Sequence, residues 1–382
     1  MLAHSPGRRT IFLFIALAWQ ATALSPAQSQ APCGVPQAGG DWPVASQAEA
    51  GLNPERLCDL VDEITKLDAN IHSVLIVRGG KLVFEHYRAG VDQKWGLSLP
   101  DAAQGPDIKH DVRSVSKSVT SLLIGIALER KLIADLDRPV FSYFPEYAAA
   151  RTQAKDGILL RHLITMSSGL EWDESTSYDS AHNSEVVMNL MPQPYRYVLD
   201  QELADEPGTI WNYNGGGVAL LGAIIQKTSG KRLEEFAREA LFTPLGITDF
   251  EWSTMRNRDA SAAAGLRLRS RDMAKLGLLM LSDGKWNGKT IVSAEWVQES
   301  MKPRFWIEFG HYGYLWWLGS YRFADKWIDS TEANGLGGQR IIVLPALDMV
   351  IVFTAGYYDS INGWKATIPM VKHYILPAAV QP

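Results

Sequence analysis

The sequence predicts a mixed α/β fold in which an antiparallel sheet flanked by helices is combined with an all-helical part. Runs rich in β-branched and aromatic residues lie near both ends of the 382-residue chain, at 72–85 and 312–355. Residues 114–245, between these runs, carry apolar helical stretches. Strands from both ends can share one sheet, so we expect the helices as an insert in a single domain. The expected limits are 46–378 for the domain, about 46–113 and 262–378 for its α/β part, and about 114–261 for its helical part.

Local signals predict the elements in chain order. A capping asparagine before a proline starts the first helix, a Gly-Gly pair between β-rich runs marks a hairpin, and glycine ends a later helix. The elements expected first are a helix from Asn53 to Leu67, hairpin strands at 72–77 and 81–85, and helices at 115–129, 159–166 (with Gly169 as its C-cap), 218–228 and 233–241. Those expected later are strands at 262–268, 312–318, 339–345 and 349–355, a helix at 271–281 capped by Ser270, and a closing helix at 370–376.

The segment before the domain has a different composition. Arg8 and Arg9 precede a short apolar stretch from Ile11 to Leu24, and small residues follow. This pattern is typical of a secretory signal peptide, because the stretch is shorter than the ~20 residues that a spanning helix needs. We expect a signal peptide at 1–23 and a linker rich in Pro, Gln, Ser and Gly at 24–45. The protein is then secreted or periplasmic without a stable membrane anchor; an uncleaved anchor is the alternative.

Composition and charge exclude some classes of function. The chain is 46% hydrophobic and 21% charged, its formal net charge is −5, and it has no Lys/Arg-rich run. These values argue against a nucleic-acid partner. Cys33 and Cys58 are the only cysteines, and we expect a disulfide between them, with two free buried thiols as the alternative. The eight histidines show no metal-ligand spacing, so no metal and no cofactor is expected.

Ser114–Lys117 (Ser-Val-Ser-Lys) is the most informative stretch for function. An apolar run follows Ser114 and ends at Leu128, so this serine is expected at the N-terminus of a buried helix. The i, i+3 spacing puts the serine and the lysine on one helix face. A serine hydroxyl needs a neighbouring base to become a good nucleophile, and helix N-terminal N–H groups can hold a developing oxyanion. Ser282 and Lys285 repeat the spacing, but they enclose an Asp-Gly turn signal.

Two further segments carry candidate functional residues. Tyr213 lies in a loop that begins with Pro-Gly and ends with three glycines, so it is expected to be exposed and positioned. Gly335–Gln339 (Gly-Leu-Gly-Gly-Gln) precedes a predicted strand, and its glycines allow the backbone to approach a ligand closely. Each segment taken alone could equally be a half-buried aromatic residue or a β-bulge.

Together and in this order, the three segments resemble the serine β-lactamase-like, penicillin-recognising family. The branch they resemble most contains class C β-lactamases and their esterase and amidase relatives, including 6-aminohexanoate-dimer hydrolases. Phrases at 163–170, 265–277 and 291–296 are also similar to that branch. The resemblance implies the β-lactamase/transpeptidase-like fold, with an active site between the sheet and the helical subdomain. It also implies a serine hydrolase that cleaves a small-molecule ester, amide or short oligomer through an acyl-enzyme.

The resemblance also implies roles for individual residues. Ser114 matches the acylated nucleophile, Lys117 its partner, and Tyr213 the tyrosine that shares proton transfer. Gly335-Leu336-Gly337 stands where many members have Lys-Thr-Gly, and the backbone N–H groups of Ser114 and Gly338, or a neighbour of Gly338, would form the oxyanion hole. Residues expected to bind substrate are Trp172, Tyr178, Asn214, Gly335 and Gln339. Further aromatic candidates for the pocket are Tyr312, Tyr314, Trp316 and Trp317, of which the first three would share a face of one strand.

Departures from the family pattern leave several activities open. The third segment has no lysine, and the usual Tyr-x-Asn reads Tyr213-Asn214-Gly215. Because that lysine often binds the carboxylate of β-lactams, we expect a carboxylesterase or amidase ahead of a β-lactamase or a D-amino-acid peptidase. A non-hydrolytic sensor domain that binds β-lactams or peptidoglycan is the alternative from another class. A Ser-His-Asp hydrolase is disfavoured, since the chain has no Gly-x-Ser-x-Gly.

The general base must be neutral Lys117 or the phenolate of Tyr213. Free lysine titrates near ~10.4 and free tyrosine near ~10, so we expect one of these two pKa values to be depressed. The sequence does not decide which group acts in each half-reaction. Because the expected site is built from one chain, a monomer or weak dimer is expected.

Overall fold

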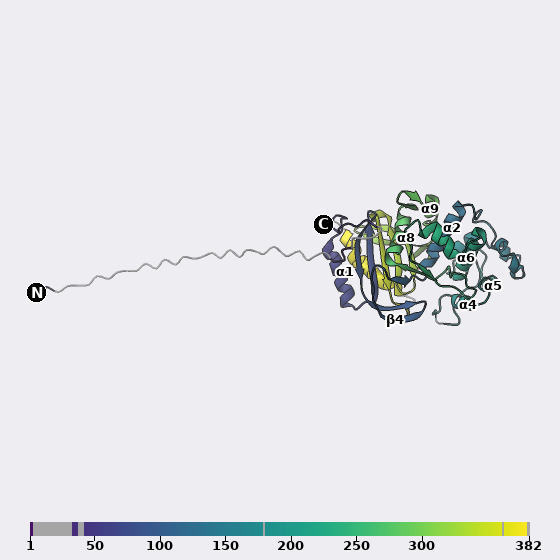
Figure 1. Ribbon diagram of the computed structural model, residues 1–382, viewed down its shortest axis with the longest axis horizontal. Helices are drawn as coiled ribbons and strands as arrows, with labels where there is room; N and C mark the ends of the chain where they lie inside the picture. The colour runs from purple at the N-terminus through teal and green to yellow at the C-terminus, as the bar shows by residue number, and fades with distance from the viewer. Residues whose placement is uncertain (3–32, 37–41, 179, 361–362, 380–382) are drawn as a thin grey trace. The chain divides into compact units, whose positions relative to one another are not determined.

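The computed structural model describes residues 1–2, 33–36, 42–178, 180–360 and 363–379 (Figure 1). Residues 32–382 form one compact unit. The expected signal peptide at 1–23, apart from its first two residues, and most of the expected linker at 24–45 lie outside the described residues. The predicted disulfide between Cys33 and Cys58 is present, with the two Cα atoms 5.1 Å apart. In the described ranges, we find no helix that is long and apolar enough to cross a membrane.

An eight-stranded antiparallel sheet forms the centre of the compact unit. The strand order is β10-β11-β12-β13-β14-β15-β1-β2, so the first strand of the chain pairs with both the last strand and the second one. This order confirms the prediction of a sheet built from both ends of the chain. The strands are β1 (Ile71–Arg78), β2 (Lys81–Tyr87), β10 (Phe305–Ile307), β11 (Gly310–Tyr312), β12 (Trp317–Phe323), β13 (Lys326–Gly335), β14 (Gln339–Leu344) and β15 (Met349–Ala355).

Helices cover both faces of this sheet, and for this reason β14 and β15 are buried at every position. In β15, Val350 and Val352 pack into a core with helices α2 and α8, whereas Ile351 and Phe353 pack into a second core with α1 and the C-terminal helices. Asn53 caps α1 as predicted, since its side chain accepts hydrogen bonds from two backbone N–H groups of the first turn. The helices are α1 (Pro54–Lys66), α8 (Ser270–Leu281), α9 (Ala294–Ser300), and the C-terminal run α10 (Ile368–Met370), a π-helical turn (Val371–Ile375) and α11 (Leu376–Ala379).

The helical part lies between β5 and β6 in the chain. In Figure 1, helices α2, α4, α5 and α6 gather at one end of the compact unit, away from α1. Helix α2 (Val115–Glu129) has the predicted limits and packs against α6 (Gly215–Ser229). The other helices of this part are α3 (Leu160–Ile164), α4 (Ser184–Leu190), α5 (Pro194–Asp200), α7 (Leu233–Ala237), a π-helical turn (Arg238–Phe242) and 3-10 turns at Val140–Tyr143, Pro145–Ala150 and Lys155–Gly157. Outside the helical part, two further 3-10 turns lie at Pro345–Leu347 and Gly363–Thr367.

A small three-stranded sheet joins the two parts. Its order is β5-β7-β6, and β5 runs directly into the segment that carries Ser114. Two separate hairpins, β3 with β4 and β8 with β9, complete the strands. The bounds are β3 (Gly90–Lys94), β4 (Leu97–Ala102), β5 (Lys109–Asp111), β6 (Glu251–Trp252), β7 (Leu266–Arg269), β8 (Lys285–Trp286) and β9 (Lys289–Thr290).

The strand predicted at 312–318 is wrong. Strand β11 ends at Tyr312 and β12 begins at Trp317, and the turn between them includes Leu315 with a φ of +60°. Alternation along one strand therefore does not place Tyr312, Tyr314 and Trp316 on a common face. A run of aromatic residues has high β propensity at every position, so composition alone did not reveal the turn.

Three smaller predictions also need correction. The helix predicted at 159–166 ends at Ile164, and Met166, with a φ of +59°, is the first left-handed residue after it, so Gly169 is not its C-cap. Ser270 does not cap α8 but is its first residue, and its hydroxyl lies 2.6 Å from that of Ser73. The strand predicted at 262–268 begins only at Leu266.

Candidate active site

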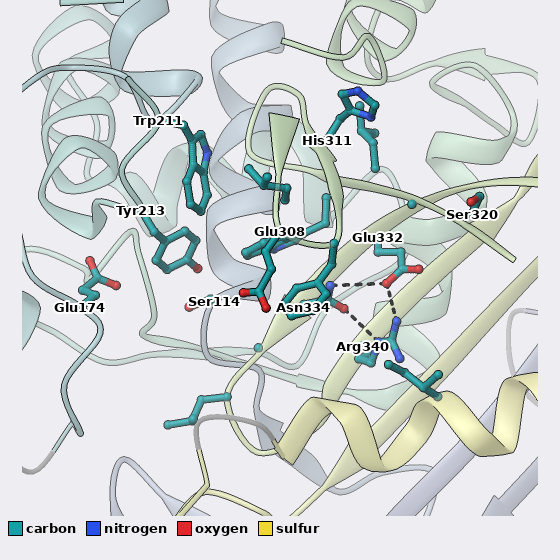
Figure 2. A pocket seen from close by; sticks show the side chains of 18 of the residues that line it. Ser114, Glu174, Trp211, Tyr213, Glu308, His311, Ser320, Glu332, Asn334 and Arg340 are labelled. Atoms are coloured by element: carbon teal, nitrogen blue, oxygen red, sulfur yellow. Dashed lines mark hydrogen bonds and ion pairs between the residues drawn. The ribbon is translucent and has the colours of Figure 1, made fainter. Parts of the chain in front are cut away.

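Ser114 lies at the junction between β5 and α2. The backbone N–H of Val112 donates to Leu266 of β7, and Arg113 then turns the chain with a φ of +50°. Ser114 is at the N-cap position of α2, but its side chain makes no capping hydrogen bond. Its hydroxyl instead lines a cavity of about 620 Å³ between the helical part and the sheet (Figure 2).

Lys117 lies directly behind the serine, one turn into α2. Its Nζ is 3.2 Å from Ser114 Oγ, 3.2 Å from the carbonyl oxygen of Ala263 and 3.4 Å from Glu185 Oε2. The lysine is 1% exposed. An ammonium group has three N–H donors and no acceptor, so these three oxygens satisfy the charged form of this side chain.

Two buried glutamates lie below the lysine. Lys117 Nζ is 3.8 Å from Glu174 Oε2 as well as 3.4 Å from Glu185 Oε2. Glu174 also accepts hydrogen bonds from Trp172 Nε1 at 2.6 Å, from the Tyr178 hydroxyl at 3.0 Å, and from the backbone N–H of Gly215. Two carboxylates therefore share one buried ammonium group.

Burial and charge determine the pKa values in this cluster. Burial and the charge of Glu185 raise the pKa of Glu174, and the nearby lysine does not fully offset them. Burial by itself lowers the pKa of Lys117. The negative charge of Glu185 and its neighbours outweighs burial, so the pKa of Lys117 is raised. Glu174 is therefore the group in the cluster that holds an additional proton most readily.

The prediction that either Lys117 or Tyr213 has a depressed pKa is wrong. Burial raises the pKa of Tyr213, and the adjacent Lys117 charge lowers it by a smaller amount. The pKa of Lys117 is raised as well. In the resting site the lysine is thus an ammonium and the tyrosine a neutral phenol.

Tyr213 lies beside both of the other candidate catalytic residues. It lines the same cavity as Ser114, and the Lys117 ammonium lies 4.8 Å from the centre of its ring. The loop that carries it is held by Asn212, whose backbone N–H donates to Met166 and whose side chain donates to Trp172. A serine hydroxyl, an ammonium group and a phenol are therefore brought together from α2 and the loop before α6.

The glycine-rich third segment connects two strands instead of only entering one. Gly335 is the last residue of β13 and Gln339 the first of β14. A Cβ atom at Gly335 would lie 2.3 Å from the carbonyl oxygen of Val112, so only glycine allows this approach to the nucleophile's strand. Gly335 and Leu336 line the cavity, and the N–H of Gly338 donates to Gly335 O at 3.3 Å. Leu336, and not Gly337 or Gly338, is thus the residue after Gly335 that lines the same cavity as Ser114.

Charged and polar side chains from β11, β13 and β14 form the far wall of the cavity. Arg340 Nε donates to Asn334 Oδ1 at 3.0 Å, and the same guanidinium pairs with Glu332. Tyr321 and Thr367 accept further hydrogen bonds from this guanidinium, at 3.0 and 2.7 Å. Figure 2 shows this group opposite Tyr213 and Trp211, with Glu308 between the two walls.

The residues expected to bind substrate fall into two groups. Tyr178, Trp317 and Gly335 line the cavity. The others are used for packing: Asn214 caps α6 by accepting from Gly217 N–H at 2.9 Å, and Gln339 is fully buried against Tyr358. Those that the structure does not place in the cavity wall are Trp172, Asn214, Tyr312, Tyr314, Trp316, Gly337, Gly338 and Gln339.

The sequence analysis missed several residues that form the site. Glu174 and Glu185 come from a loop and the first turn of α4, and the far wall comes from strands that pair at long range. A Trp-x-Glu pattern at Trp172 and Glu174 could have suggested a buried acid, since the indole N–H donates to that carboxylate. The other cavity residues missed include Trp211, Glu308, His311, Glu332, Asn334, Leu336 and Arg340.

Comparison with known proteins identifies the family. A family model described as Beta-lactamase matches residues 64–358, which is more than half of the chain. The chain belongs to the β-lactamase family. This result confirms the resemblance and the fold that were predicted from the three segments.

Individual relatives place the chain near one branch of the family. It is 26% identical over 309 residues to the 6-aminohexanoate-dimer hydrolase of Paenarthrobacter ureafaciens, which covers 75% of this chain and 72% of that protein. A Bacillus anthracis structure with the provisional name 6-aminohexanoate-dimer hydrolase has a TM-score of 0.67 and 21% identity, covering 91% and 88% of the two chains. A family VIII carboxylesterase structure has a TM-score of 0.59 and 15% identity, covering 79% and 91%. Matches to several other curated relatives span less than two fifths of those proteins.

Proposed function

We propose that this protein is a serine hydrolase that cleaves ester or amide bonds through an acyl-enzyme on Ser114. The observation that carries the proposal is the position of Ser114 at the edge of a cavity of about 620 Å³, with Lys117 Nζ 3.2 Å from its Oγ and Tyr213 in the same cavity wall. A cavity of this size suits a small molecule or a short oligomer.

Proton transfer follows from the charges in the resting site. The Lys117 ammonium donates to Ser114 Oγ, so the serine hydroxyl can direct its own proton to Tyr213. As Oγ attacks the carbonyl carbon, the serine proton passes to the Tyr213 oxygen while the phenol proton passes on to the oxygen or nitrogen of the leaving group, so Tyr213 is neutral before and after the step. The positive charge of Lys117 stabilises the negative charge that develops on the tyrosine oxygen during the transfer. In the second half-reaction the relay runs in reverse: water attacks the acyl carbon, its proton passes to Tyr213, and the phenol proton returns to Ser114 Oγ as the acid is released. Tyr213 therefore needs no lowered resting pKa.

The developing oxyanion needs donors on the opposite side of the reacting carbonyl. The backbone N–H of Ser114 at the start of α2 is one, and Leu336 supplies the second from the hairpin between β13 and β14. This assignment replaces Gly338, whose N–H is directed to Gly335.

A carboxylesterase or an amidase similar to 6-aminohexanoate-dimer hydrolase fits the cavity better than a β-lactamase. Arg340, in the cavity wall just after the third segment, is already paired with Glu332 and is 1% exposed. It therefore lacks the free charge that would bind the carboxylate of a β-lactam. Relatives and fold neighbours named as hydrolases of amides or esters support the same order.

The first test compares the protein with its Ser114→Ala variant on p-nitrophenyl butyrate, the linear dimer of 6-aminohexanoate and a chromogenic cephalosporin, while intact mass is recorded. Ester or amide turnover that is lost in the variant, with little cephalosporin turnover, is the expected result. Fast cephalosporin turnover would make the protein a β-lactamase. A stable adduct on Ser114 without turnover would make it a sensor, and equal activity of both proteins would remove Ser114 from the mechanism.

We also propose that the protein is exported. The basic and apolar pattern at 1–23 and the Cys33–Cys58 disulfide support export, because disulfides persist in oxidising compartments. N-terminal sequencing of the protein from a fractionated host tests this: a mature start after residue 23 in the periplasm or medium is expected. A cytoplasmic protein that begins at Met1 would contradict it.

A further inference from the structure

Three buried residues that are distant in sequence meet behind the nucleophile. His72 lies on β1, Asp92 on β3 and His110 on β5, with exposed fractions of 0%, 2% and 0%. Each offers one ligand atom within 4.8 Å of the other two. The cluster is separate from the residues that line the cavity, but β5 leads from it to Ser114.

The hydrogen bonds of His72 show which of its ring nitrogens carries the hydrogen and which one presents a lone pair to Asp92. Its Nε2 lies 3.0 Å from the carbonyl oxygen of Val91 and 3.1 Å from Asn70 Oδ1, both of which are acceptors. Nε2 therefore carries the hydrogen, and in the neutral ring Nδ1 carries a lone pair. Nδ1 makes no hydrogen bond to any described residue and lies 3.9 Å from Asp92 Oδ1. A buried lone pair opposite a carboxylate is unfavourable unless a cation lies between them.

Asp92 and His110 supply the other converging atoms. Asp92 Oδ1 accepts hydrogen bonds from the Tyr358 hydroxyl at 3.0 Å and from Gln93 N–H at 2.8 Å. Its other oxygen, Oδ2, lies 3.3 Å from His110 Nδ1. Neither ring nitrogen of His110 forms a hydrogen bond within the described part of the chain. A carboxylate and two unpartnered imidazole nitrogens thus face one point.

We propose that His72, Asp92 and His110 bind a structural zinc ion. Imidazole and carboxylate are ordinary zinc ligands, and tetrahedral coordination at about 2.0–2.2 Å requires ligand atoms about 3.3–3.5 Å apart. The His110–Asp92 pair already has that separation, at 3.3 Å, and all three atoms lie within 4.8 Å. The Val91 carbonyl accepts the hydrogen of His72 Nε2, and the Tyr358 hydroxyl donates to Asp92. Such hydrogen bonds to the outer side of metal ligands hold them in the orientation that binding requires.

A proton shared by His110 and Asp92 is the competing arrangement. It would satisfy those two side chains, but it would leave His72 Nδ1 directed at the carboxylate without a donor. A zinc ion contacts all three groups at once. Water in the fourth position would complete the coordination.

The position of the cluster connects it to the candidate active site. The Tyr358 hydroxyl that donates to Asp92 also accepts from Gln339 at the end of the glycine-rich hairpin, at 3.2 Å. The Tyr358 ring lies 5.0 Å from the guanidinium of Arg113, the residue before Ser114. A bound ion would therefore fix β1, β3 and β5 together and hold both the nucleophile's strand and the third segment in place.

The test measures metal in the full chain, purified without a histidine tag and without chelator. Inductively coupled plasma mass spectrometry is expected to find close to one zinc per chain, and Asp92→Asn and His110→Gln are expected to lower it at least tenfold. His373→Gln, at an exposed histidine, is the matched control and should keep its zinc. Zinc returned to chelator-treated protein at 100-fold above its dissociation constant should raise the Tm by about 3–5 °C.

Cobalt(II) provides a second measurement that does not depend on the variants folding. Tetrahedral cobalt in the wild-type protein should give intense visible absorption that zinc displaces stoichiometrically. Zinc below 0.1 per chain, together with no Tm response to added zinc, would overturn the proposal in favour of a shared proton. Full retention of zinc by a folded Asp92→Asn variant would overturn it as well, because the ion would then lie elsewhere.

Discussion

Two buried cations lie on different sides of the cavity, Lys117 behind Ser114 and Arg340 in the far wall, and the carboxylates of the described residues are distributed differently around them. Lys117 pairs with both Glu174 and Glu185, whereas the ion pair of Arg340 that Figure 2 shows is with Glu332. Both cations are 1% exposed. The two clusters therefore bury similar groups with a different balance of charge.

The balance of charge determines what each cluster can do. Burial and the charge of Glu185 raise the pKa of Glu174, so the lysine cluster contains a carboxyl group that can gain or lose a proton. A guanidinium remains charged at all relevant pH values, and the partners of Arg340 satisfy it from several elements. Buried charge thus supports chemistry on one side of the cavity and a fixed shape on the other.

The largest expected effect separates these two roles. Lys117→Met should lower kcat/KM for p-nitrophenyl butyrate by about 10³-fold or more, because the negative charge that develops on the Tyr213 oxygen during proton transfer loses its counter-charge. Arg340→Met is the matched cation deletion across the cavity, and its kcat should stay within about tenfold of wild type in protein that remains folded. Activity of the Lys117 variant within tenfold of wild type would show that the two clusters do not differ in the proposed way.

The second effect concerns stability. Arg340→Met should reduce the free energy of unfolding by about 3–5 kcal/mol, since it leaves Glu332 buried without its cation. The double variant with Glu332→Leu should recover most of this loss, as measured by urea unfolding. If the double variant is as unstable as the single one, the pairing is not what makes the arginine important.

The third effect is the pH dependence of the lysine cluster. Because the pKa of Glu174 is raised on folding, the folded state binds more protons than the unfolded state above the ordinary carboxyl range. The stability that the protonated Glu174 carboxyl contributes should therefore be fully present below about pH 4.3, the ordinary pKa of a glutamate. It should be lost as the pH rises through the raised pKa of Glu174 in the folded state. Glu174→Gln, which cannot ionise, should flatten the Tm between pH 5 and 9, whereas Glu206→Gln at an exposed position should not. Parallel profiles for all three proteins would contradict this.

The smallest effects on stability and activity are expected for Asn214, which belongs to neither of the two charged clusters. Asn214 follows Tyr213 but caps α6, so Asn214→Ala should cost about 1 kcal/mol of stability. Its kcat/KM should remain within about threefold of wild type, because the side chain is buried against the helix end. A tenfold rise in KM without loss of stability would restore the substrate-binding role that the sequence suggested.

Local signals in the sequence determined the elements whose contacts are close in the chain. The limits of α2 and the contact of Ser114 with Lys117 follow from helical spacing, and the cap of α1 follows from Asn53 and Pro54. The order of the three segments was enough to predict the family, and the β-rich runs near both ends of the chain predicted the sheet that they share. These features depend on helix geometry or on segments that are informative by themselves.

Only the tertiary structure decided which distant groups meet. Glu174 and Glu185 reach Lys117, Arg340 reaches Glu332, and Leu336 replaces Gly338 in the cavity wall, through strand register and loop packing that no local pattern encodes. The turn at Leu315 separated aromatic residues that composition had placed on one strand. His72, Asp92 and His110 likewise share no recognisable spacing, and they meet because β1, β3 and β5 pack together. Side chains that are distant in sequence acquire their partners, charges and pKa values only from that packing.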